Sequence, residues 1–472
     1  MKKFDETVIA IWALVICALG ASLVEPDPGV LWFSARTLGI VVLLSLVLPL
    51  VKILYLPERI AHPMTIVSIG FVYFLVLDMV SFREVEDYPP QIILGADLVI
   101  ALFVATVFSG WAFSRVSARR WRTALAGVDG NLSASAYFWL AIAGFGLEYL
   151  RRLYLDGFSF SELVWDLSLA RAGGAFRRGN LGDSTVWMQP VEVLFWLVPL
   201  FAERAWKRGV GTLAKVIAVP VVISCLGTLV LDGTRGYLLF AICLPLLVRA
   251  VERERALGRD MALMVLASFV LAPVLDSMYQ VRGAGWDYLW RVDGVSWNMV
   301  SAERDDNFHS VVNLVDILEQ GDGILEHRGP LGFISGSLKF GRLALASPVP
   351  RALWPSKPSP FDLAGEGRGW WESGSIVADL LDGGGITFVI FGGFCLGLWI
   401  RLLESLYEVR KEDGAALVYS MLLAVTLSIL RGLYPWNTVP LVLSTIGLVM
   451  VCRVLRSLNL VRASSMSAAC LP

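Results

Sequence analysis

The chain has 472 residues, of which 56% are hydrophobic and only 17% are charged. Soluble domains carry about 25% charged residues, so this composition excludes an ordinary soluble protein and indicates one embedded in a membrane. The formal net charge of −1, without a basic patch, gives no support for nucleic-acid binding.

Apolar runs begin close to the N-terminus. Lys2 and Lys3 precede a first run at residues 7–24, which is longer than the apolar part of a signal peptide and lacks a convincing cleavage site. We therefore expect this run to be a retained first helix. The further apolar runs are 31–51, 63–80, 92–113, 134–150, 188–201, 212–231, 236–249, 261–278, 376–400, 415–430 and 438–452.

A helix that spans a membrane needs about 20 mostly apolar residues, which several of these runs approach or reach. The runs predict an all-α fold, a polytopic membrane helix bundle of about 12 transmembrane helices. Residues 1–278 would hold about nine of these helices and residues 376–462 the last three. Residues 463–472 form a tail rich in Ser and Ala that we expect to be disordered.

The connections between the runs alternate in length and charge. One alternating set is short and rich in Lys and Arg, which indicates the cytoplasmic side. An even number of spans then places both termini in the cytoplasm. After the N-terminal lysines, the basic connections are residues 52–59, 115–122, 204–208, 249–259, 401–411 and 453–462.

Two connections of the opposite, external set are long. Residues 151–187 contain two Arg pairs and a Gly pair, and residues 279–375 form a large extracytoplasmic loop. Part of this loop is predicted to be helical, because apolar residues recur at helical spacing. These residues are Val311, Leu314, Val315 and Leu318.

Three arginines stand at the external ends of predicted spans, each followed by glycine. They are Arg235, Arg282 and Arg431. Arginine binds phosphate oxygens in a bidentate manner, and a helix N-terminus such as the one after Arg235 also favours anions. We interpret the three as candidates to bind a lipid-linked phosphate or diphosphate. The alternative for each is an arginine that reaches toward lipid headgroups.

The large loop contains further candidates for a polar site. Four prolines between residues 348 and 358 favour a rigid extended segment that holds Arg351 and Lys357, with Trp354 available to stack on a sugar. A rigid connector is the alternative reading of this segment. His309 and Glu372 are the candidate catalytic bases, His309 because its side chain titrates near neutral pH.

The residues that usually bind metals are few and scattered. The three histidines, His62, His309 and His327, have no cysteine nearby, so we expect no metal site. The six cysteines fall in apolar runs or in the C-terminal tail, which does not favour an extracellular disulfide framework.

The same short motifs resemble those of Wzy-type polymerases, bacterial membrane enzymes that polymerise O-antigen or capsule repeat units. The resemblance rests on the sequences around Arg235, Arg282 and Arg431, on the Pro-Arg-Ala-Leu-Trp-Pro-Ser-Lys-Pro motif at 350–358, and on the Gly-rich start of the run at 376–400. The topology of nearly the whole chain is similar as well.

The resemblance implies a glycosyltransferase of the bacterial inner membrane that works at its periplasmic face without metal or other cofactor. Its substrate would be an oligosaccharide linked to undecaprenyl diphosphate in the bilayer, with a chain-length regulator and a flippase as candidate partners. Arg235, Arg282, Arg351, Lys357 and Arg431 would bind the diphosphate.

Three other functions remain open at this point. An O-antigen ligase would use the same lipid-linked donor with another acceptor, and a flippase would transport the same molecule. A lipid-phosphate-dependent mannosyltransferase would use acids in the first external connection, where Glu25 and Asp27 lie. The sugars, the acceptor and the base are not determined by the sequence.

Overall fold

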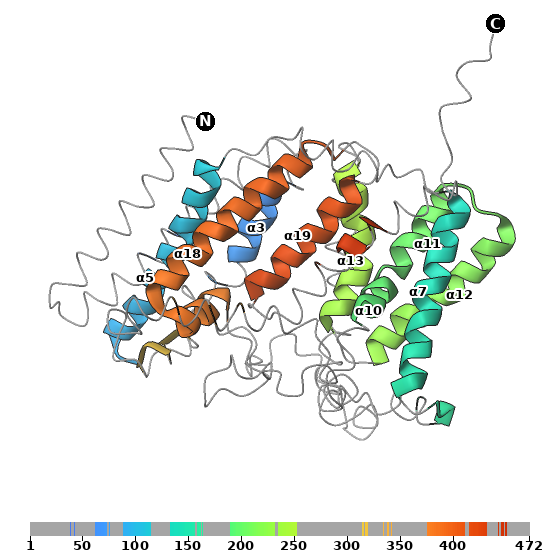
Figure 1. The fold of residues 1–472 in the computed structure, drawn as a ribbon, viewed down its shortest axis with the longest axis horizontal. Coiled ribbons are helices and arrows are strands. Elements are labelled where there is room, and N and C mark those ends of the chain that lie inside the picture. The colour runs from blue at the N-terminus through green and yellow to red at the C-terminus, as the bar shows by residue number, and fades with distance from the viewer. Residues whose placement is uncertain are drawn as a thin grey trace, which may run out of the picture.

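The structure, a computed structural model, describes the chain in separate ranges. These are residues 38, 42, 62–72, 75, 88–114, 133–155, 158–161, 163, 189–231, 235–252, 314–315, 317–319, 334, 338, 341, 375–410, 415–431, 442, 445–447 and 449–450. Within them all regular structure is helical (Figure 1). The helices are α3 (Pro63–Phe71), α5 (Pro90–Phe113), α7 (Ala134–Leu155), α10 (Gln189–Trp196), α11 (Val198–Lys207), α12 (Thr212–Leu231), α13 (Arg235–Glu252), α18 (Ile376–Tyr407) and α19 (Ala415–Arg431).

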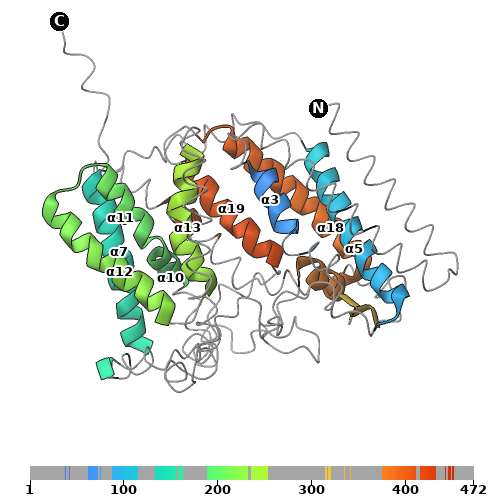
Figure 2. The same ribbon diagram turned by 180° about the vertical axis from the view of Figure 1, so that it is seen from behind.

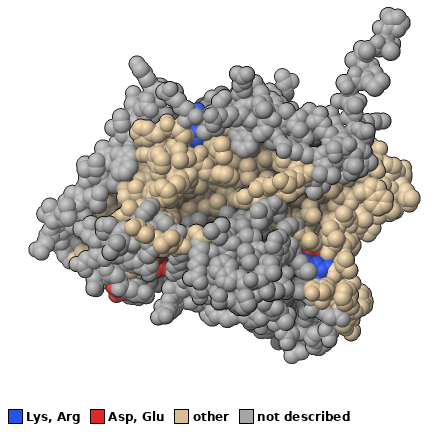
Figure 3. Space-filling model, in the orientation of Figure 1, with Lys and Arg blue, Asp and Glu red and all other residues tan. Residues whose placement is uncertain are grey.

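Three of the described helices, α5, α12 and α18, are long and apolar enough to cross a membrane. On the face drawn in Figure 3, the described surface is largely free of charged side chains and has only small charged patches. These features support a membrane protein with an all-helical described part. The predicted spans at 7–24 and 261–278 lie outside the described residues, and those at 31–51 and 438–452 lie mostly outside them.

The run predicted as one span at 188–201 forms two helices, α10 and α11, which meet at Leu197. Pro199 stands in the first turn of α11 and has no backbone N–H to donate, which favours a helix start there. The Leu197 N–H still donates to the Val193 carbonyl at 3.1 Å, so the two helices follow one another closely. Together they continue to Lys207, beyond the predicted end.

Helix α18 is longer than predicted and is sharply bent. Gly385 has φ 72° and ψ −168°, a backbone conformation that favours glycine and interrupts the helix. A Cβ placed on Gly392 would lie 2.7 Å from the side chain of Leu380. In a straight helix these two residues would be separated by about 18 Å along the axis. Residues 376–384, the half-helix, therefore fold back against the rest of α18.

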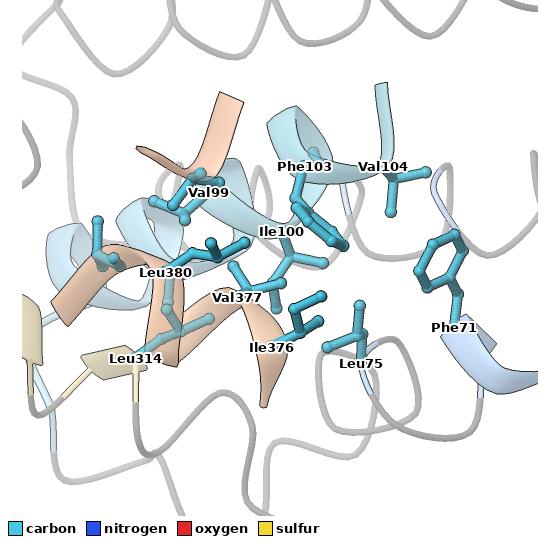
Figure 4. Close-up of a cluster of buried hydrophobic side chains, with 14 of the residues drawn as sticks. Phe71, Leu75, Val99, Ile100, Phe103, Val104, Leu314, Ile376, Val377 and Leu380 are labelled. Carbon is cyan, nitrogen blue, oxygen red and sulfur yellow. The ribbon is translucent and has the colours of Figure 1, made fainter. Parts of the chain in front are cut away.

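One buried cluster lies between α5, α3 and the half-helix (Figure 4). Ile100 and Phe103 of α5 face Ile376 and Val377 of the half-helix there. Residues of the predicted loop helix join the same cluster. Leu314, Val315 and Leu318, which the spacing predicts to share a helix face, are helical and at most 1% exposed.

A second buried cluster joins α7, α10, α11, α12, α13 and α19 with the last turns of α18. Figures 1 and 2 show these helices grouped on one side of α18, with α5 on the other. Helix α12 lies at the edge of the group and exposes apolar side chains along its length. Those that are at least 39% exposed are Leu213, Val216, Ile217, Val219 and Ile223.

The two clusters are connected by α18, whose contact with α5 is formed by glycines. A Cβ on Gly397 would lie 2.1 Å from the Val107 carbonyl oxygen, and one on Gly110 would lie 2.2 Å from the Phe394 carbonyl oxygen. Gly393 is equally close to Thr106, at 2.1 Å. Small residues at such spacing allow two membrane helices to approach until their backbones touch.

Gly397→Ala is expected to destabilise the protein, because the added methyl group would displace the backbone of α5. The free energy of unfolding, measured by detergent titration of the purified protein, should fall by about 1–3 kcal/mol. Gly227→Ala in α12 is the matched control, since a Cβ there meets no atom within 4 Å. Equal stability of the two variants would contradict the close α5–α18 contact.

Candidate functional site

At one end of the bundle, polar contacts join the ends of several helices. We call this end the predicted cytoplasmic end. Arg249 of α13 binds Glu203 of α11 at 2.7 Å, and Arg204 of α11 binds Glu252 of α13. The two helices therefore run in the same direction. All these residues belong to connections, or to helix ends beside them, that the basic pattern assigns to the cytoplasm.

A second network at this end centres on Glu404 near the end of α18. Its carboxylate accepts a hydrogen bond from Trp111 Nε1 at 2.9 Å, lies 3.2 Å from His62 Nε2 and binds Arg401. The start of α3 and the ends of α5 and α18 thus lie together.

Four charged residues form a buried ion cluster at the opposite end, between α7 and α10. Arg151 donates from Nε and Nη2 to the two carboxylate oxygens of Glu148, at 2.7 and 2.8 Å. Arg152 Nε donates to Glu148 Oε1 at 2.7 Å, and Arg151 Nη2 lies 2.6 Å from Glu192 Oε1. We call this set of four residues the α7–α10 ion cluster.

The helical spacing explains how one carboxylate binds two arginines. Glu148 stands three residues before Arg151 and four before Arg152, the separations at which side chains on a helix meet. Glu192 lies in the first turn of α10, where its negative charge is attracted by the partial positive charge of the helix start. Arg152 lies in the last turn of α7, where its positive charge is attracted by the partial negative charge of the helix end.

Burial makes the α7–α10 ion cluster energetically important. The side chains of Glu148, Arg151 and Arg152 are only 1–3% exposed. Buried charges are tolerated when they are paired and hydrogen-bonded, and the loss of one partner is costly. The two acids balance the two bases, so the cluster fixes the end of α7 against the start of α10.

Neighbouring contacts hold the same region together. Tyr149 and Thr228 share a hydrogen bond of 2.8 Å that joins α7 to α12. The Cys225 thiol of α12 donates to the Phe195 carbonyl of α10 at 3.3 Å. The Arg152 guanidinium lies 5.9 Å from the centre of the Phe195 ring. These three contacts join α7, α10 and α12 around the α7–α10 ion cluster.

Two of the arginines predicted from the sequence lie at helix ends. Arg235 is the first residue of α13, and Arg431 is the last residue of α19. Since α13 runs in the direction of α10 and α11, its start lies at the same end as the start of α10 (Figure 1). Helix α13 packs against both α10 and α19.

The direction of α19 brings Arg431 to that end as well. Leu430 lies within 2.7 Å of a Cβ placed on Gly70, near the end of α3 that is remote from His62. The other predicted site residues lie outside the described residues. These are Arg282, His309, Arg351, Trp354, Lys357 and Glu372.

The α7–α10 ion cluster was not among the predicted site residues. The sequence pattern assigns its two arginines to the external connection at 151–187 and Glu148 to the preceding apolar run. An acid three and four residues before an Arg pair, inside an apolar run, is the signal that identifies such a cluster. No group of His, Cys, Asp and Glu suited to a metal ion occurs among the described residues.

Comparisons of the chain with protein-family models, with curated proteins and with solved structures found no significant match.

Glu148→Gln is expected to destabilise the protein strongly, because it leaves two buried guanidinium groups without their shared carboxylate. The free energy of unfolding should fall by about 3–5 kcal/mol. Glu252→Gln removes an acid from a more exposed pair and should cost about 0–1 kcal/mol. Similar losses in the two variants, measured by detergent titration, would show that burial does not set the strength of the α7–α10 ion cluster.

Proposed function

We propose that the protein is a membrane glycosyltransferase that polymerises oligosaccharide repeat units linked to undecaprenyl diphosphate. The observation that carries the proposal is the position of Arg235 and Arg431 at the ends of two packed helices, on the same end of the bundle. That end corresponds to the external side in the predicted topology, which would be the periplasmic face of a bacterial inner membrane.

The proposed reaction breaks the bond between the anomeric carbon of the growing glycan and its lipid diphosphate. The hydroxyl oxygen of the incoming repeat unit forms a new bond to that carbon and gives up its proton to a base. The lipid diphosphate leaves with additional negative charge. Cations near the leaving oxygen lower the barrier, because they bind the transition state more strongly than the ground state.

Arginine at a helix start suits this task for two reasons. Its planar guanidinium donates two parallel hydrogen bonds to phosphate oxygens. The unpaired N–H groups at the start of α13, next to Arg235, add partial positive charge at the same place. Arg431 would contribute a second guanidinium from α19.

The α7–α10 ion cluster supports the proposal because it holds α10, which packs against the helix that begins with Arg235. It fixes the start of α10, which packs against α13 through Trp196 and Phe240, whose ring centres are 5.9 Å apart. We propose that this packing holds the start of α13, and with it Arg235, in place for the diphosphate. Arg282, Arg351 and Lys357 remain proposed diphosphate ligands, Trp354 a proposed sugar contact, and His309 and Glu372 the proposed bases.

A flippase for the same lipid-linked oligosaccharide is the second candidate. It is favoured by one observation, a fully buried carboxylate at Asp97 inside α5, because transporters often place ionisable residues within membrane helices. An O-antigen ligase shares the donor and the proposed diphosphate site.

Deletion of the gene distinguishes the polymerase from the ligase and the flippase. A single repeat unit left on the lipid anchor of the surface polysaccharide indicates a polymerase, and absence of attached glycan indicates a ligase or a flippase.

Arg235→Ala and Arg431→Ala are each expected to abolish long glycan chains while the protein remains in the membrane, and Arg282→Ala should behave alike. Loss of one transition-state contact of this kind lowers a rate by about 10²–10³-fold. Lysine at these positions should restore activity only in part, since it cannot bind in a bidentate manner. Gel electrophoresis of the surface polysaccharide reports chain length.

Arg249→Ala is the matched control, because Arg249 lies near the other end of the same helix as Arg235. Long chains should persist in this variant. Normal chain length in all three variants at Arg235, Arg282 and Arg431 would overturn the proposed diphosphate site.

A further inference from the structure

Asp97 is a fully buried carboxylate in the interior of α5. It is 0% exposed, and neither of its carboxylate oxygens has a hydrogen-bond partner in the part of the chain that the structure describes. No other charged residue occurs in α5. An ionisable side chain inside a membrane helix is costly to retain, which makes Asp97 a candidate for a function beyond packing.

Apolar residues enclose Asp97 on its own helix. Ile93, Leu94, Ala96 and Leu98 are at most 3% exposed. Val99 and Ile100, one turn or less beyond Asp97, lie beside Val377 and Leu380 of the half-helix in Figure 4. Asp97 therefore belongs to the stretch of α5 that the half-helix covers.

The described elements around this stretch offer no positive charge. The half-helix carries the acids Asp379 and Asp382 and no base, and α3 carries no charged residue. The described loop-helix residues add Glu319, another acid. The Arg401 guanidinium carbon lies 5.8 Å from the centre of the Trp111 ring, near the other end of α5. That contact is about 21 Å farther along the helix axis than Asp97.

An ionised carboxylate in such surroundings would keep its full desolvation cost. Binding a proton removes the charge and converts the carboxylate into a neutral carboxylic acid, with the proton taken from water. A neutral acid can remain in an apolar cluster at much lower cost.

We propose that Asp97 is an intramembrane proton-binding site. Its carboxyl group holds a proton while the half-helix packs against α5, and it releases the proton only when the two elements separate and water reaches it. The half-helix is joined to the rest of α18 at Gly385, where the helix is already interrupted, and in this proposal it is the element that moves away from Asp97. The proton-binding site is independent of the proposed glycosyltransferase activity.

Infrared spectroscopy of the purified full-length protein in lipid nanodiscs tests the proposal at neutral pH. The spectrum of the parent protein should contain a C=O band from a protonated carboxylic acid that is absent from Asp97→Asn. Asp382→Asn is the matched control, because Asp382 lies half-buried on the half-helix, and it should leave the band unchanged. The melting temperature of Asp97→Asn should equal that of the parent protein, since asparagine has the shape of the neutral acid.

Three outcomes would overturn the proposal. The first is the absence of a protonated-acid band that depends on Asp97. The second is a marked fall in the melting temperature of Asp97→Asn, which would indicate a required negative charge. The third is a rise in the melting temperature of the parent protein on addition of sodium or potassium that Asp97→Asn lacks, which would show a metal cation in place of the proton.

Discussion

The backbone contact between α5 and α18 is the constraint on which the described structure depends. Gly110, Gly393 and Gly397 leave no room for a side chain, so the last turns of α5 touch the middle of α18. In a membrane, where lipid tails are as apolar as leucine, helices associate through such close packing more than through the hydrophobic effect. Because α18 also reaches the second buried cluster, this contact positions that cluster relative to α5.

Charged groups complete the arrangement at the two ends of the bundle. At the predicted cytoplasmic end, the side chains that pair α11 with α13 are between 16% and 32% exposed, which is typical of surface ion pairs. At the other end, Glu148, Arg151 and Arg152 of the α7–α10 ion cluster are almost fully buried, and Glu192 is 27% exposed. The two ends thus differ in kind. One consists of exchangeable surface pairs, and the other holds charges that must stay paired for the helices to remain folded together.

Much of the fold follows from the sequence because apolar runs and helices coincide. The predicted run at 212–231 has the same limits as α12, and α5 begins only two residues before its predicted run. The bend of α18 was not predictable, because glycines occur at 383–385 and again at 392–393, and only packing against α5 decides which of them turns the chain.

The α7–α10 ion cluster depends on Glu192, which is distant in sequence from Arg151, so no local pattern includes it. Arg235 and Arg431 were predicted from their motifs, and the structure describes each as a helix terminus, although their role stays a prediction.

Helix α12 has a consequence for how the surrounding bilayer acts on the protein. It exposes most of its length, whereas α5 is enclosed almost completely by other helices. Its 20 residues span about 30 Å, close to the hydrocarbon thickness of a typical membrane. A thicker or thinner bilayer favours a different tilt of such a helix. Only three residues separate α12 from α13, so we expect a change in the tilt of α12 to shift the start of α13, where Arg235 stands.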